Sequence, residues 1–341
     1  LQILQLLGLR AGVIALTKCD RASAARIEAA RAEIADLVKG SFLENVPVME
    51  TSADTGSGIP ELRQHLLRAA HKHTNAASER PFRLAIDRAF TLRGSGLVIT
   101  GTVHSGVVST DQEVFLFPGG RKSRVRSLHV QNQPAEHAGP GDRAALNLAG
   151  LEGAEIARGQ WLSASPQDGH RCLVMNLTVL ADFPRPVRHW TPVHIYHATS
   201  HTTGRLALLE GTRVVPGEHA LVQIETDEPL LAKHGDRIVI RDYSLDRTLG
   251  GGEILDNRAH SGRRRDPGRI AAIAAFRERS PAAALQALLA LGPVDLDAFQ
   301  RVWDLPAGEM DAIAAQQAAG RHGAELVASN LWLHWRQLLL T

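Results

Sequence analysis

The sequence is poor in the features that build disulfide frameworks and helical membrane spans. Its 341 residues contain two cysteines, Cys19 and Cys172, which lie far apart in the chain. This number argues against a disulfide framework and favours a reducing compartment, so we expect a cytoplasmic location. No apolar run reaches the ~18 to 20 residues that a membrane-spanning helix needs, and we expect no membrane partner. The opening segment "LQILQLLGLRAG" has no basic n-region and no small-residue cleavage site, so we do not interpret it as a signal peptide.

The chain also lacks a strong charge of one sign. Its formal net charge is +2, so no whole-chain field attracts nucleic acid or a membrane surface. The 38 Lys and Arg and 16 His still allow local basic patches. A hydrophobic fraction of 44% is typical of a globular chain, and the length predicts two or three domains.

The pattern along the chain divides into four regions. Residues 1–77 alternate short apolar strands with helices, which predicts an α/β sheet with right-handed crossovers. Residues 78–166 and 167–256 consist of short β-type runs punctuated by Gly, Pro and Asp, which predict two β-barrels. Residues 257–341 begin with a basic linker and return to a helical period with a β-like close, as in a winged-helix unit. The predicted fold class is therefore multidomain α/β plus β.

The short stretch "TKCD" follows the first apolar strand of the α/β region. At the carboxyl end of a parallel strand, where open α/β sheets bind ligands, the Asp20 carboxylate can accept hydrogen bonds from N1–H and the amine of guanine. The stem of Lys18, which follows Thr17, can lie on the purine face. About 30 residues on, a second strand runs into Ser52 and Ala53, where a backbone N–H can meet guanine O6. The alternative is that Asp20 only begins a loop and caps the next helix.

These segments resemble the selenocysteine-specific translation elongation factors of bacteria, a family of P-loop GTPases. "TKCD" and "TSA" match the guanine-reading elements of that class. "IDRAFTLRGSGLVITGTVHSGVV" and "GPGDRAALNLAGLEGAEIARGQWL" look like its first barrel, and "HIYHATSHTTGRLALLE" and "RIVIRDYSLDRTLGGGEILD" look like its second. The resemblance implies a monomeric translation factor that uses GTP with Mg²⁺ to deliver selenocysteyl-tRNA to the ribosome, with winged helices that bind an mRNA hairpin.

The phosphate-binding half of such a site is missing from the sequence. The string G-x-x-x-x-G-K-[ST], which cradles phosphates, does not occur, and neither does D-x-x-G. We therefore expect a chain truncated at its N-terminus, with weak or no GTP binding, no hydrolysis and no catalytic residue of its own. At the other end, one winged-helix unit is expected to be complete, and residues 331–341 to start another.

The resemblance also places a selenocysteyl pocket in the first barrel, at Asp87, Arg88 and Arg158. A selenol is more acidic than a thiol, whose pKa is about 8.5, so a selenolate is expected at neutral pH while serine stays neutral. A fixed arginine charge can then reject serine, because a desolvated cation would be left without an anion. The alternative is that Asp87 and Arg88 form an ordinary ion pair at the barrel rim.

Two other functions stay open at this point: a different GTPase of the elongation factor Tu type, or a non-enzymatic RNA-binding remnant. No metal site is expected. His194 and His197 of "HIYHATSH" face opposite sides of a strand, so they do not converge with His201 as metal ligands. The basic linker at residues 262–266 either touches phosphate or is simply solvated.

Overall fold

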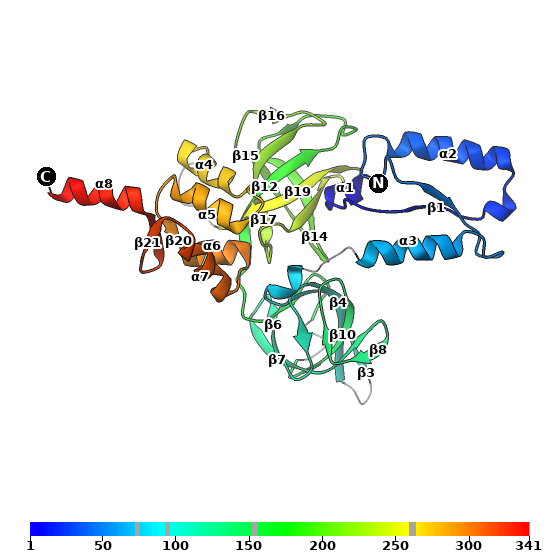
Figure 1. The fold of residues 1–341 in the computed structure, drawn as a ribbon, viewed down its shortest axis with the longest axis horizontal. Helices are drawn as coiled ribbons and strands as arrows, with labels where there is room; N and C mark the ends of the chain where they lie inside the picture. Colours follow the sequence, from blue (N-terminus) through cyan, green and yellow to red (C-terminus); the bar gives the residue numbers. More distant parts are fainter. Residues whose placement is uncertain (72–75, 93–95, 152–155, 259–263, 341) are drawn as a thin grey trace. The chain divides into compact units, whose positions relative to one another are not determined.

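The computed structural model describes residues 1–71, 76–92, 96–151, 156–258 and 264–340. They form two compact units, within residues 1–75 and within residues 76–341. Figure 1 shows the path of the chain through both.

The first unit is a small α/β layer. Its two strands are paired in parallel, with Ile14 opposite Val48 and Leu16 opposite Glu50. Ser23 caps the long helix because its Oγ accepts a hydrogen bond from the Arg26 N–H (3.3 Å), as its sequence pattern predicts. The elements in chain order are α1 Gln2–Leu6, β1 Ile14–Leu16, the 3₁₀ turn η1 Cys19–Arg21, α2 Ala24–Val38, β2 Val48–Glu50 and α3 Ile59–His71.

The second unit begins with a six-stranded barrel. Its strands are joined in the order β10–β4–β3–β11–β6–β7, and the pairing of β7 with β10 closes the ring. Its interior contains Ile86, Ile99, Leu128 and Leu146, all fully buried. The strands are β3 Arg83–Leu92, β4 Gly96–Ser105, β6 Glu113–Phe117, β7 Arg121–Val130, β10 Arg143–Ala149 and β11 Trp161–Ser163, with the short β5 Val108–Ser109, β8 Gln133–Ala135 and β9 His137–Ala138, after the turn η2 Ala76–Glu79.

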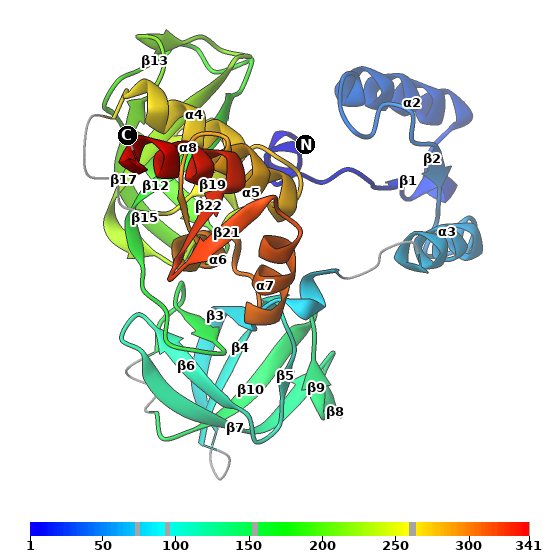
Figure 2. The same ribbon diagram turned by 60° about the vertical axis from the view of Figure 1, so that its left-hand side comes forward.

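A second closed barrel follows, in the strand order β12–β17–β15–β14–β18–β19. Figure 2 shows the two barrels as separate bodies of the same unit. Apolar residues alternate along the strands, so that Leu173, Met175, Leu177 and Val179 of β12 fill the interior. The strands are β12 His170–Val179, β14 Thr191–His197, β15 Ser200–Leu208, β17 His219–Leu230, β18 Arg237–Asp242 and β19 Thr248–Asp256, with the short pair β13 Val187–Arg188 and β16 Arg213–Val214.

The last region has the element order of a winged helix. Three helices alternate with a three-stranded sheet in the order α5, β20, α6, α7, β21, β22. The two barrels and this helical part confirm the predicted fold class. The bounds are α4 Pro267–Ala275, α5 Pro281–Leu289, β20 Val294–Asp295, α6 Leu296–Trp303, α7 Ala307–Ala315, β21 Ala319–His322, β22 Glu325–Ala328 and α8 Ser329–Leu340.

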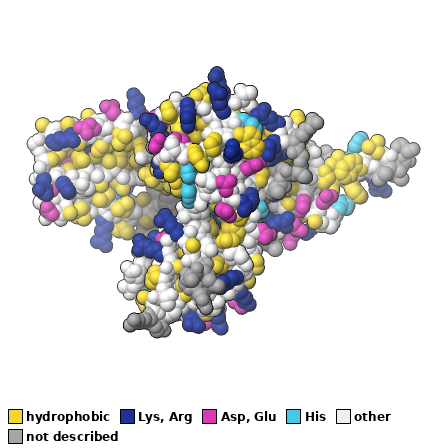
Figure 3. All heavy atoms as spheres, turned by 180° about the vertical axis from the view of Figure 1, so that it is seen from behind, with side chains coloured by type: hydrophobic (Ala, Val, Ile, Leu, Met, Phe, Trp, Pro, Cys, Tyr) yellow, Lys and Arg dark blue, Asp and Glu magenta, His cyan; other side chains and the backbone are white. Residues whose placement is uncertain are grey.

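Helix α8 carries large apolar side chains on its surface. Trp332 and Leu333 are about half exposed, as are Trp335 and Leu338, and Figure 3 shows this apolar cluster next to a histidine. Within the described ranges, no helix combines the length and the apolar character that crossing a bilayer requires.

The helical part shares one core with the second barrel. Val174, Leu209 and Leu255 of the barrel belong to the same buried cluster as Phe276 and Phe299 of the helices. The basic linker adds polar contacts, because Arg265 donates to the carbonyl oxygens of Leu208 and Gly211. Arg264 pairs with Glu225, and Arg269 donates to Gln223. These three arginines therefore fix the helices to the barrel, a role that the sequence did not indicate; residues 262 and 263 lie outside the described residues.

Both barrels and the helical part meet at one buried charge cluster. The guanidinium of Arg83, on β3, donates to both carboxylate oxygens of Asp236 in the second barrel (2.9 and 3.1 Å). Its Nε lies 3.4 Å from a carboxylate oxygen of Asp304, the residue that follows α6. His197 also contacts Asp236 (3.1 Å), and Trp161 packs within the same interface. This Arg83–Asp236–Asp304 cluster is the polar centre of the unit.

Two titratable groups at this junction have shifted pKa values. Burial alone would raise the pKa of Asp236, but the charge of Arg83 and the hydrogen bond from His197 outweigh it and hold that pKa well below its ordinary range. Burial lowers the pKa of His234, whose ring lies 3.7 Å from that of Trp303 and whose Nε2 donates to the Phe276 carbonyl (2.8 Å). The folded chain therefore favours a charged Asp236 and a neutral His234.

The neutral His234 predicts a loss of stability in mild acid. Because its pKa is lower in the folded chain, the unfolded chain binds the proton first, and stability falls as the pH drops below about 6.5. We expect His234→Gln to flatten the slope of unfolding free energy against pH between 7 and 5, by up to about 1 kcal/mol per pH unit. Urea titrations across this range measure it, with the exposed His129→Gln as control. A slope equal to that of the wild type would show that His234 takes up its proton without cost.

Candidate functional site

The predicted guanine-reading residues lie at one edge of the first unit. Thr17, Lys18 and Asp20 follow the carboxyl end of β1, and Ser52 and Ala53 follow that of β2. Backbone hydrogen bonds join the two loops: the Thr51 N–H donates to Leu16 (2.8 Å), and the Cys19 N–H donates to Thr51 (3.2 Å). The parallel pairing of the strands thus brings together segments about 30 residues apart.

The local conformation leaves Asp20 facing solvent. Lys18 has a left-handed backbone (φ +61°) and starts the turn η1, whose first turn carries the exposed Asp20. The cap of α2 is Ser23, so the alternative that Asp20 caps this helix is wrong. Thr17 and Lys18 are exposed as well. The three side chains are therefore accessible to a ligand at this edge.

The second loop presents a backbone donor. Ser52 is buried, its N–H donates to the Ser57 carbonyl (2.9 Å), and its Oγ accepts from the Thr55 N–H (3.2 Å). These contacts fix the loop, while the neighbouring Ala53 is exposed and its N–H has no acceptor among the described residues. The loop thus offers the geometry expected for a contact with a base oxygen such as guanine O6.

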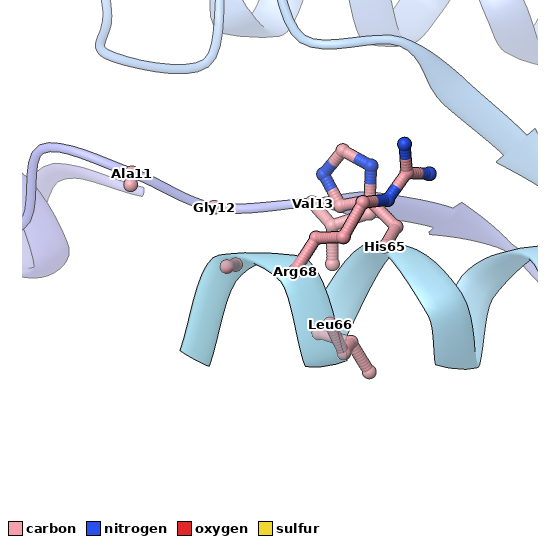
Figure 4. Close-up of a pocket in the computed structure, with 7 residues that line it drawn as sticks. Ala11, Gly12, Val13, His65, Leu66 and Arg68 are labelled. Atoms are coloured by element: carbon pink, nitrogen blue, oxygen red, sulfur yellow. The ribbon is translucent and has the colours of Figure 1, made fainter. Parts of the chain in front are cut away.

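A hollow of the first unit lies at the opposite end of β1. A cavity of about 500 Å³ is lined by Ala11, Gly12 and Val13, which precede the strand, and by His65 and Arg68 of α3. Figure 4 shows the side chains of His65 and Arg68 rising toward the Ala11–Val13 segment, while Leu66 points away. This cavity is separate from the guanine-reading edge, which follows the strand.

The predicted selenocysteyl pocket lies around a bulge in β3 of the first barrel. The register against β4 shifts between Ile86 and Arg88, which leaves Asp87 as the extra residue. Asp87 accepts a hydrogen bond from Thr100 Oγ1 (2.5 Å) and pairs with Arg143 of β10 (2.6 Å). The ordinary ion pair at the barrel rim therefore forms between Asp87 and Arg143 and, among the described residues, not between Asp87 and Arg88.

The turn that carries Arg158 lies against the same bulge. The Gly159 N–H donates to the Ile86 carbonyl (3.1 Å), and the Ile86 N–H donates to the Gln160 carbonyl (2.9 Å). Gly159 has φ +94°, and a Cβ there would lie 3.2 Å from the Ser200 Cα, so the turn requires glycine. The structure therefore places the turn of Arg158 against the segment of β3 where the bulge begins.

The charge at this bulge is positive. Asp87 is only 18% exposed and is neutralised by Arg143. Arg88 and Arg158 are both exposed, and neither has an acidic partner among the residues that the structure describes. Two guanidinium groups at one rim thus remain available for an anion. Sequence reasoning missed Arg143, because no local pattern shows that a residue opening β10 reaches a bulge on β3.

The histidines of the second barrel, His194, His197 and His201, do not converge as metal ligands. His194 and His201 contact each other through Nδ1 and Nε2 (2.9 Å), whereas His197 points inward to Asp236. Across the described part of the chain, no three His, Cys, Asp or Glu side chains converge as metal ligands.

Both barrels match models of known protein families. The family model for elongation factor Tu domain 2 matches residues 96–163, within the first barrel. The model for the β-barrel domain of selenocysteine-specific elongation factors matches residues 174–261, over the second. The selenocysteine-specific elongation factor of Escherichia coli is 35% identical over the whole chain, and that of Desulfomicrobium baculatum is 38% identical over 75% of it.

The chain is thus similar, over its whole length, to a selenocysteine-specific elongation factor. It covers 54% of the E. coli protein and 40% of the D. baculatum protein, so it spans about half the length of these relatives or less. The fold is similar to that of the crystal structure of bacterial EF-Sec, with a TM-score of 0.78 at 20% identity over 99% of this chain and 55% of that one. A factor from Methanococcus maripaludis in complex with the GTP analogue GppNHp gives a TM-score of 0.63 at 23% identity, over 72% of this chain and 59% of that one.

Proposed function

We propose that the complete protein is a GTPase that delivers selenocysteyl-tRNA to the ribosome at recoded UGA codons. GTP or GDP with Mg²⁺ would bind the first unit once a phosphate-binding half is present, with Asp20 and the Ala53 N–H reading guanine. The two barrels would hold the aminoacyl end of the tRNA, and the winged-helix part would link the complex to an mRNA hairpin. The helical continuation after the second barrel favours this function over that of an elongation factor Tu, which ends with its third domain.

The observation that carries the proposal is the pair of exposed arginines at the β3 bulge. Because Arg143 already neutralises Asp87, the charges of Arg88 and Arg158 are free to face an anion. A selenolate satisfies both guanidinium groups, whereas the neutral serine hydroxyl leaves them desolvated and without a counterion. The pocket therefore supports discrimination between selenocysteine and serine on the same tRNA.

Substituting the two arginines tests this function. In the complete protein bound to GTP, we expect Arg88→Ala and Arg158→Ala each to reduce the preference for selenocysteyl-tRNA over seryl-tRNA by about tenfold or more, the value of one charge-assisted hydrogen bond. Filter binding with both charged tRNAs gives the ratio. Arg126→Ala, an exposed arginine on β7 of the same barrel, is the control and should keep the wild-type ratio. If both pocket variants also keep it, the selenocysteyl pocket lies elsewhere.

A further inference from the structure

A second hollow lies where the two barrels and the helical part meet. Its volume is about 350 Å³, and its lining comes from all three parts. Arg80 precedes β3, His234 lies between β17 and β18, Arg279 lies between α4 and α5, and Trp303 ends α6. The guanine-reading edge and the selenocysteyl pocket share none of these residues.

The charges around this junction hollow are unbalanced. Its two acidic residues are already paired: Asp236 binds Arg83, and Glu253 binds Arg237 (2.8 Å). Arg80 and Arg279 also line it, and neither has an ion-pair partner among the described residues. Two positive charges therefore face the hollow without compensation.

One residue that lines the hollow has a buried hydrogen-bond donor without a partner. Trp303 is 3% exposed, and its indole N–H has no acceptor among the residues that the structure describes. A buried N–H without a partner is costly, and native structures seldom retain one without a reason. Its neighbour His234 has its Nε2 proton directed to the Phe276 carbonyl. The groups without a partner at this place, two guanidinium groups and one N–H, are therefore all donors, and a negatively charged acceptor would suit them.

We propose that this junction hollow binds a phosphate group. Guanidinium groups bind phosphate oxygens in a bidentate manner, and the several oxygens of one phosphate can serve two arginines and a further N–H at once. The phosphate can be free inorganic phosphate or a phosphate of an RNA backbone. Because these ligands come from the segment before the first barrel and from the helical part, a bound phosphate would hold the helical part against the first barrel.

The first experiment measures binding of inorganic phosphate to the chain of residues 1–341 by calorimetry, with ionic strength held constant by chloride. We expect Arg80→Gln and Arg279→Gln each to weaken binding by about tenfold or more. Arg277→Gln is the matched control, because it removes an exposed positive charge two residues from Arg279 but does not line the hollow. No phosphate binding by the wild type, or an equal loss in Arg277→Gln, would overturn the proposal.

The second arm identifies the source of the phosphate. A short oligouridylate is titrated into the same variants with and without inorganic phosphate. If RNA binds, competes with phosphate and loses about one unit of salt-dependence slope in Arg279→Gln, the ligand is a backbone phosphate. If phosphate binds and RNA does not compete, the ligand is free phosphate. Neither assay uses GTP or aminoacyl-tRNA, so both results are independent of the proposed delivery function.

Discussion

Replacing Arg83 by methionine is expected to destabilise the second unit by about 3 to 5 kcal/mol. The substitution keeps much of the side-chain volume but removes the charge that holds Asp236. The carboxylate would then stay buried with hydrogen bonds from His197 and from the Lys233 N–H, which do not replace a guanidinium. Urea unfolding followed by tryptophan fluorescence measures the loss, because Trp161 and Trp303 both lie at this junction.

A double-mutant cycle separates the lost attraction from the cost of the orphaned charge. If the cost comes from an unpaired carboxylate, Arg83→Met with Asp236→Asn should recover a large part of the stability that Arg83→Met alone loses. The control is Arg124→Met, which breaks an exposed ion pair with Asp111 (2.9 Å) and should cost less than about 1 kcal/mol. An Arg83→Met variant no less stable than this control would mean that water solvates Asp236 in the native unit.

The fold could be predicted because its information is local. "LVITGTV" and "VMNLTVL" are short runs that contain several β-branched residues, and they lie in β4 and β12. Ser23 gave the start of α2, since a capping side chain acts within three residues of its own position. The meeting of the two loops that carry the predicted guanine-reading residues could also be predicted, because parallel strands place their carboxyl ends together.

The polar partners could not be predicted, because they depend on long-range register. Asp87 pairs with Arg143 only because the bulge turns its side chain toward β10, and the strand pattern of "FRLAIDRAF" contains no sign of a bulge. Likewise Arg83 and Asp236 are 153 residues apart and belong to different barrels. Arg265 of the linker meets backbone carbonyls of the second barrel, which any sequence presents equally. Such contacts follow from how the parts pack together.

Asp20→Asn is expected to reduce the preference for GTP over ATP by about a hundredfold or more in a chain that contains the phosphate-binding half. The Asp20 carboxylate would accept two hydrogen bonds from the guanine edge, and each such charge-assisted bond contributes about 1.5 to 3 kcal/mol. The amide introduced by Asp20→Asn has only one acceptor oxygen, and its N–H₂ group would face a hydrogen-bond donor of the base. Competition binding with fluorescent GTP against ATP measures the ratio.

A base with altered edge groups distinguishes this role from a structural one. Xanthine has a carbonyl oxygen where guanine has its exocyclic amine, so the amide that Asp20→Asn introduces could donate where the carboxylate accepted. Asp20→Asn should therefore bind the xanthine nucleotide better than the wild type does, while Asp36→Asn, an exposed carboxylate on α2, should match the wild type for every base. A merely misfolded loop would lose all nucleotides alike, and an unchanged GTP-over-ATP ratio would remove Asp20 from base reading. The gain for xanthine is the decisive result, because only direct contact between residue 20 and the base edge produces it.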